Sequence, residues 1–169
     1  MIFLSYALDA CFSRQSTLWP VALSAVLRFL PLGALLPAVG VDAADHRLPT
    51  PWLRAAAVAA LLHPLLAMVV GDPSVALSSA LGAAACFAVL RLAAVLSGMG
   101  RGDLRLGSVV GLAAGFPLGV FALASATAAC GAFMLVRRRR ATAFGPFLVG
   151  GHVAAVAAGV LRCRGLLHG

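Results

Sequence analysis

The 169-residue chain has no lysine and no glutamate, and its only acidic residues are five aspartates. Charged residues make up 11% of the sequence, against about 25% in soluble domains, whereas hydrophobic residues make up 62%. A soluble domain of this length could not hide so much apolar surface, but a chain that has lipid as its solvent need not hide it. The composition therefore excludes an ordinary soluble domain and predicts an all-α, polytopic membrane bundle.

Metal and phosphate motifs are also missing. No two of the four cysteines form a CxxC pair, no HExxH occurs, and the absence of lysine excludes a GxxxxGK[ST] phosphate loop. His63 and His152 lie inside apolar runs, where a hydrogen-bonded core histidine is commoner than a ligand. We therefore expect neither a metal nor a cofactor.

All 13 basic residues are arginines, and the formal net charge is +8. Such a balance fits either nucleic acid or an anionic membrane surface. Most of these arginines lie in short gaps between apolar runs, where they act as a topology signal under the positive-inside rule. We therefore expect the lipid bilayer, and not nucleic acid, as a partner; the oligomeric state is left open.

The apolar runs predict six membrane spans. A single helix over 106–136 would be about 45 Å long, well beyond the roughly 30 Å hydrocarbon core. A break near 115–119 gives two short helices and puts the three arginine-bearing gaps on one side, with both termini on the other. The expected spans are about 18–41, 52–70, 75–96, the two halves of 106–136, and 144–161.

These spans define a membrane domain over 18–161, preceded by a segment of uncertain structure (1–17) and followed by a short tail (162–169). Prolines at 20, 31 and 37 predict bends in the first span. Arg28 lies in the same span and either snorkels, faces the bundle interior or indicates a differently placed helix.

An ionisable residue opens the apolar run at 106. Asp103 follows the glycines Gly98, Gly100 and Gly102 in the segment GMGRGDLRL. A carboxylate at such a depth indicates a functional site, although a lone Asp at a helix start is more often a cap. The glycines would let this backbone approach another backbone closely.

A second aspartate is expected beside Asp103. Two crossings separate Asp42, at the end of the first span, from Asp103, so both lie at the same membrane boundary. Asp45 competes with Asp42, whereas Asp72 in Gly-Asp-Pro-Ser is typical of a turn on the other face. Two close carboxyls hold one proton between them, so one acts as an acid and the other as a base that activates water.

Three segments, in order, resemble the type IV prepilin peptidases. GMGRGDLRL is similar to the family's glycine-rich GxGD segment, Asp42 followed seven residues later by Pro49 is similar to its first active-site segment, and Phe144-Gly145-Pro146-Phe147 after a basic run is similar to its C-terminal segment. The register of the first active-site segment selects Asp42 over Asp45.

The resemblance implies an aspartic endopeptidase of the bacterial inner membrane, with its site on the cytoplasmic side. Its substrate would be a prepilin or pseudopilin, whose basic leader is removed after a glycine. Asp42 and Asp103 would form the catalytic pair, and Gly98, Gly100, Gly102 and Arg105 would support the loop.

The sequence also departs from the family pattern. The family often has Gly at the position of Arg101, Lys at that of Arg105 and Asn at that of Thr50. Without the paired CxxC motifs of the longer members, we expect cleavage without methylation of the new N-terminus. The alternatives are a degenerate homologue and a non-enzymatic membrane protein, such as a small transporter or a pilus or secretion assembly subunit, in which the aspartates serve packing or proton coupling.

Overall fold

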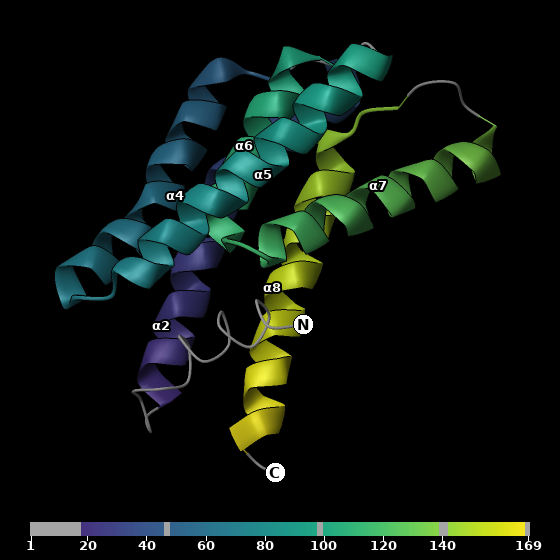
Figure 1. Ribbon diagram of the computed structural model, residues 1–169. Helices are drawn as coiled ribbons and strands as arrows, with labels where there is room; N and C mark the ends of the chain where they lie inside the picture. The colour runs from purple at the N-terminus through teal and green to yellow at the C-terminus, as the bar shows by residue number, and fades with distance from the viewer. Residues whose placement is uncertain (1–17, 46–47, 98–99, 139–141, 168–169) are drawn as a thin grey trace.

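The computed structural model describes residues 18–45, 48–97, 100–138 and 142–167, and all regular elements in these ranges are α-helices. The all-α prediction is therefore confirmed; the predicted segment 1–17 lies outside the described residues. The helices are α2 (Leu18–Phe29), α3 (Leu32–Asp45), α4 (Thr50–Val70), α5 (Pro73–Ser97), α6 (Arg101–Ala114), α7 (Leu118–Arg137) and α8 (Gly145–Leu167) (Figure 1).

Four helical segments are long and apolar enough to cross a membrane, which makes the chain a helical membrane protein: Leu23–Asp42, Thr50–Val70, Pro73–Val95 and Leu118–Arg137. The six expected spans include two shorter ones. Helix α6 has 14 residues, equivalent to about 21 Å, and the apolar part of α8, Gly145–Leu161, is also short. Helix α6 therefore lies inside the bundle without the length of a full span, whereas α8 as a whole has 23 residues.

The expected break in the 106–136 run is confirmed. Helix α6 ends at Ala114 and α7 begins at Leu118, with Gly115 at a φ of 74° between them. This backbone conformation, with a positive φ, is one that glycine adopts at little cost. The turn reverses the chain, so α7 returns toward the end of the bundle where α6 began (Figure 1).

The first span is interrupted at Pro31, one of the three prolines at which bends are expected, whereas α2 includes Pro20 and α3 continues through Pro37. Helix α2 ends at Phe29, and α3 begins at Leu32 directly after Pro31. Arg28 faces the bundle interior, because its guanidinium donates a hydrogen bond to the carbonyl oxygen of Ala114 at the end of α6. The last carbonyls of a helix lack partners within the helix and favour a cation, so this contact satisfies both groups.

Two helix boundaries differ from the expected ones. Helix α4 begins at Thr50, not Trp52, because Pro51 fits in a first turn, where no backbone N–H is needed. Helix α8 continues to Leu167, six residues beyond the expected end of the last span at 161. This segment contains no proline that would end the helix.

Helix α6 lies at the centre of the bundle, in contact with α2, α4, α5, α7 and α8. Its inward side chains, among them Leu106 and Val110, are fully buried. The approach to α5 is closest where Gly82 faces Gly111: a Cβ on Gly82 would contact the Gly111 carbonyl oxygen and lie 2.7 Å from the carbonyl carbon of Gly115. Lipid supplies little drive for helices to associate, so such close packing is what holds them together.

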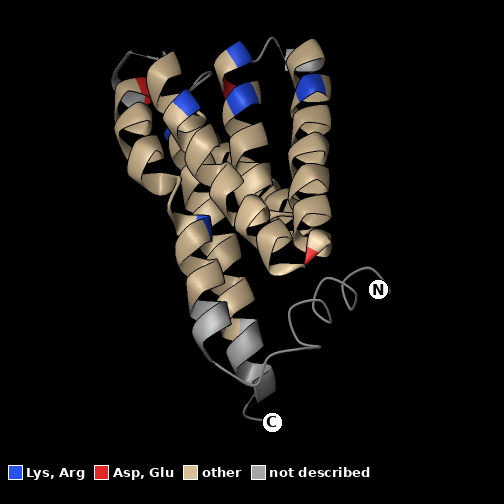
Figure 2. Cartoon of the chain, turned by 90° about the vertical axis from the view of Figure 1, so that its left-hand side faces the viewer, with Lys and Arg blue, Asp and Glu red and all other residues tan. Residues whose placement is uncertain are grey.

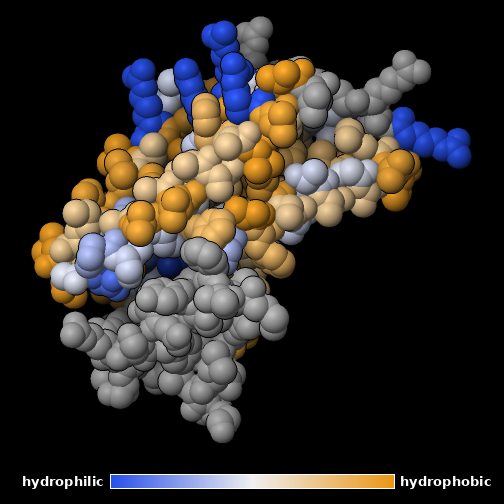
Figure 3. All heavy atoms as spheres, in the orientation of Figure 1, coloured by the Kyte–Doolittle hydropathy of each residue, from blue (hydrophilic) through white to orange (hydrophobic). Residues whose placement is uncertain are grey.

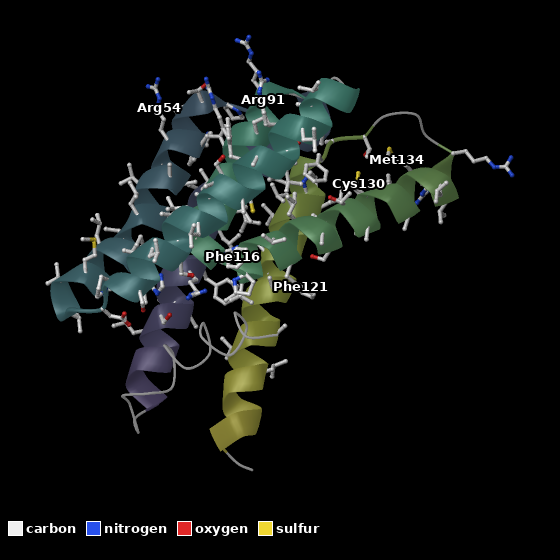
Figure 4. All side chains as sticks on the ribbon, in the orientation of Figure 1. Arg54, Arg91, Phe116, Phe121, Cys130 and Met134 are labelled. Carbon is white, nitrogen blue, oxygen red and sulfur yellow. The ribbon has the colours of Figure 1, made fainter. Side chains whose placement is uncertain are left out.

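Charge is concentrated at one end of the bundle. The exposed arginines Arg54, Arg91, Arg101, Arg105 and Arg137 lie where α4 and α6 begin and where α5 and α7 end. Most of the blue residues gather there in Figure 2, whereas the sides of the bundle are largely hydrophobic (Figure 3). Figure 4 shows Arg54 and Arg91 pointing away from the bundle at this end. The arginine-bearing gaps therefore share one end, as the two-helix interpretation of 106–136 predicted.

Candidate active site

Both proposed catalytic aspartates lie at the arginine-bearing end of the bundle. Asp42 belongs to the last turn of α3 and is buried, with 6% of its surface exposed. Asp103 belongs to the first turn of α6 and is half-buried. The two carboxyl groups are close enough for the charge of Asp42 to act on Asp103. Residues 61 positions apart in the chain are thus brought together by two antiparallel crossings.

The first residue of α8 completes the surroundings of Asp42. The backbone N–H of Gly145 donates a hydrogen bond to Oδ2 of Asp42, with a distance of 3.2 Å between the two heavy atoms. The first amides of a helix have no partner within the helix, and its dipole favours an anion there. The motif Phe144-Gly145-Pro146-Phe147 therefore lies at the site, a contact that the sequence analysis did not predict.

Asp103 is not acting as a conventional helix cap. Although it occupies the first turn of α6, its carboxylate makes no hydrogen bond to a backbone amide among the residues that the structure describes. Burial raises the pKa of the Asp103 carboxyl from 3.8 to about 6, and the charge of Asp42 adds to the increase. Asp103 therefore titrates near neutral pH, in the range where an acid catalyst is useful.

The glycine-rich segment positions Asp103 through side-chain packing. Gly100 precedes α6, and a Cβ on Gly102 would lie 3.1 Å from Cδ1 of Leu48, in the connection that follows α3. The expected approach of backbone to backbone is therefore wrong at Gly102, because the neighbour is a side chain. Arg105 is exposed, and Gly98 lies outside the described residues.

Helix α7 reaches the site through Cys130, one of the four cysteines that form no CxxC pair. The thiol is buried and close enough to Asp103 to interact with it electrostatically. Figure 4 labels Cys130 together with Met134 on this helix. Four helices, α3, α6, α7 and α8, therefore meet at the aspartates.

Two buried histidines and the turn aspartate Asp72 have hydrogen-bond partners away from the site. Nε2 of His63 lies 3.0 Å from the Ser24 hydroxyl, and Nε2 of His152 lies 3.0 Å from the Arg28 carbonyl oxygen, which confirms both as hydrogen-bonded core histidines. Asp72 accepts hydrogen bonds from the backbone and the hydroxyl of Ser74, as predicted for a turn. Within the described parts of the chain, no three His, Cys, Asp or Glu residues are grouped as metal ligands would be.

Asp103→Asn is expected to stabilise the folded protein at alkaline pH. Folding raises the pKa of the Asp103 carboxyl from 3.8 to about 6. Below pH 3.8 the group is protonated in both states and does not affect stability. As the pH rises from there through about 6, ionisation of the carboxyl lowers the stability of the folded protein. Because solvent screens a half-buried group, Asp103→Asn should raise the free energy of unfolding at pH 8 by on the order of 1 kcal/mol.

Thermal unfolding in detergent at several pH values tests this prediction. The midpoint for Asp103→Asn should exceed that of the parental chain by about 2–4 °C at pH 8, and the difference should shrink toward zero at pH 4. Asp72→Asn is the matched control, because asparagine retains the oxygen that accepts from Ser74. A difference that is independent of pH would contradict the assignment.

No protein-family model, curated protein or solved structure matches this chain. The fold and the site define a helical membrane protein with two neighbouring aspartates at one end of its bundle.

Proposed function

We propose that the chain is a membrane aspartic endopeptidase that removes the basic leader from type IV prepilin-like or pseudopilin substrates. The observation that carries the proposal is the meeting of Asp42 and Asp103, from helices separated in the chain, at one end of the bundle. The resemblance of three sequence segments supplies the substrate class. The three segments lie together at the aspartates, since Asp42 is close to Asp103 and Gly145 of the C-terminal segment contacts Asp42.

Two carboxyl groups and one water are sufficient for the reaction. At working pH the pair holds one proton, because two neighbouring carboxylates repel each other. The ionised member takes a proton from a water that attacks the peptide carbonyl, and the protonated member supports the oxyanion that forms. The reaction needs no group other than these residues and the water.

The position of the pair fits a substrate anchored in the membrane. Asp42 lies at the last residue of a candidate span, and Asp103 lies near the start of α6, so the pair is at a boundary and not at mid-depth. The exposed arginines at this end favour the cytoplasmic side under the positive-inside rule. We place the enzyme in the bacterial inner membrane, cutting a leader that remains in the cytoplasm.

Processing in cells tests this proposal. The chain is co-expressed with a prepilin from the same genome in a bacterial host that lacks its own prepilin peptidase, and the pilin is followed by its gel mobility and N-terminal sequence. We expect a shortened pilin whose new N-terminus follows a glycine, and no shortening when that glycine is replaced. If both proteins insert and the prepilin stays uncut, the proposed activity is wrong, and a non-enzymatic or degenerate protein takes its place.

A further inference from the structure

The two aspartates have different surroundings. Asp42 is buried and accepts a hydrogen bond from the Gly145 amide, whereas Asp103 is half-buried and has no such donor among the described residues. A carboxylate that accepts a backbone N–H is stabilised in its charged form, and the start of a helix adds to this effect. The asymmetry bears on which member of the pair holds the shared proton.

The start of α8 is fixed by packing on both sides of Gly145. Phe144 is buried, and its carbonyl oxygen accepts the first hydrogen bond of the helix, from the Leu148 amide. Phe147 packs against Phe133 of α7, with 5.5 Å between the ring centroids. The Gly145 amide is therefore held in place before any substrate binds, as a preorganised donor must be.

Only glycine leaves room for the carboxylate at this position. A Cβ on Gly145 would lie 2.7 Å from Oδ2 of Asp42, closer than such atoms approach. The atom in the way is the end of a side chain and not backbone, so the carboxylate can rotate aside at little cost to folding. A larger residue would therefore displace the carboxylate while leaving the fold in place.

We propose that Gly145 is a positioning residue whose amide holds Asp42 as the ionised general base, which leaves Asp103 as the acid. The inference rests on the proposed function and assigns separate roles within its pair. It also gives the segment Phe144-Gly145-Pro146-Phe147 a part in the chemistry.

The proton transfers balance with these roles. Asp42 takes one proton from water as the water oxygen bonds to the peptide carbon, and Asp103 gives its proton to the carbonyl oxygen. In the second step Asp42 returns its proton to the amide nitrogen as the C–N bond breaks, and Asp103 recovers a proton from a hydroxyl of the intermediate. The products are a carboxylic acid and an amine, and each aspartate ends in its starting state.

Three Gly→Ala variants in α8 separate positioning from stability. Gly145→Ala moves the carboxylate of Asp42. Gly150→Ala is the matched neutral control, because a Cβ there meets nothing within 4 Å. Gly151→Ala is the structural control, because its Cβ would press on the carbonyl oxygen of Ala122 in the backbone of α7.

Cleavage of a purified prepilin in proteoliposomes gives kcat and KM for each variant. We expect Gly145→Ala to lower kcat by about 10- to 100-fold with KM within about twofold, at a nearly parental thermal midpoint. Gly150→Ala should match the parental chain, and Gly151→Ala should lower the thermal midpoint. Parental kcat in Gly145→Ala would overturn the inference.

A second measurement uses the parental chain and does not depend on activity. An apolar carbodiimide reacts with protonated carboxyl groups, so at pH 6 it should modify Asp103 in preference to Asp42, as read by peptide mass spectrometry. In Gly145→Ala this preference should decrease. Preferential labelling of Asp42 in the parental chain would overturn the inference even if both aspartates are needed for cleavage; cleavage without either aspartate would overturn the proposed function instead.

Discussion

Replacing either Asp42 or Asp103 by asparagine is expected to abolish leader cleavage. Asparagine is close in shape to aspartate, but it cannot take a proton from water, as the base does, or give one to the carbonyl oxygen, as the acid does. Because the pair works as a unit, either change should lower kcat/KM by about 10³-fold or more, and the double variant should be no worse than the singles. Cleavage of a purified prepilin in proteoliposomes, with enzyme in excess, measures the residual rate.

The fold should tolerate both changes. Asp42→Asn keeps an oxygen that can accept from the Gly145 amide, and Asp103→Asn removes a half-buried charge. Asp72→Asn is the control, because Asp72 is bonded within its own turn and should leave cleavage unchanged. A parental cleavage rate in a correctly inserted Asp42→Asn or Asp103→Asn variant would refute the paired-aspartate mechanism.

Gly82→Ala and Gly111→Ala are expected to have the largest effects on stability. A Cβ on Gly111 would contact the Gly82 carbonyl oxygen and lie 2.7 Å from its carbonyl carbon. A Cβ on Gly82 would in turn contact the Gly111 carbonyl oxygen. Neither helix can yield as a flexible side chain would, so α5 and α6 must move apart. We expect either variant to lower the free energy of unfolding by about 3 kcal/mol or more.

The loss should be visible as a lower thermal midpoint and a smaller yield of monodisperse protein in detergent. Because α6 also carries Asp103, cleavage should fall along with the folded fraction. Gly131→Ala in α7 is the matched control: a Cβ there meets nothing within 4 Å, and alanine favours the helix over glycine. If Gly82→Ala and Gly131→Ala had equal midpoints, the close packing of α5 on α6 would not be a determinant of stability.

Much of the fold follows from local features of the sequence. The apolar runs predict helices because a backbone in lipid must satisfy its own hydrogen bonds. The break after Ala114 was predictable, since a single helix over 106–136 would be too long and a Gly-Phe-Pro-Leu-Gly segment interrupts it. The shared end of Asp42 and Asp103 then follows from counting crossings, which needs no knowledge of side-chain contacts.

The surroundings of the aspartates could not be predicted in this way. Nothing local pairs Gly145 with Asp42, because 103 residues separate them and their contact depends on how α8 packs on α3. The approach of Cys130 to Asp103 likewise depends on the angle at which α7 returns across the bundle. The sequence is compatible with three placements of Arg28, and the packing of α2 against the end of α6 shows that the side chain faces the bundle interior.

The sequence by itself therefore determined the class of protein, the order of its helices and the two aspartates at one boundary. These depend on hydrophobicity, chain length and parity, which are properties of segments taken one at a time. Only the tertiary structure decided that the glycine-rich segment packs on the Leu48 side chain, that Asp42 has a backbone donor, and that Asp103 lacks one in the described chain. Such differences arise from contacts between helices, where a single Cβ decides whether two groups can meet.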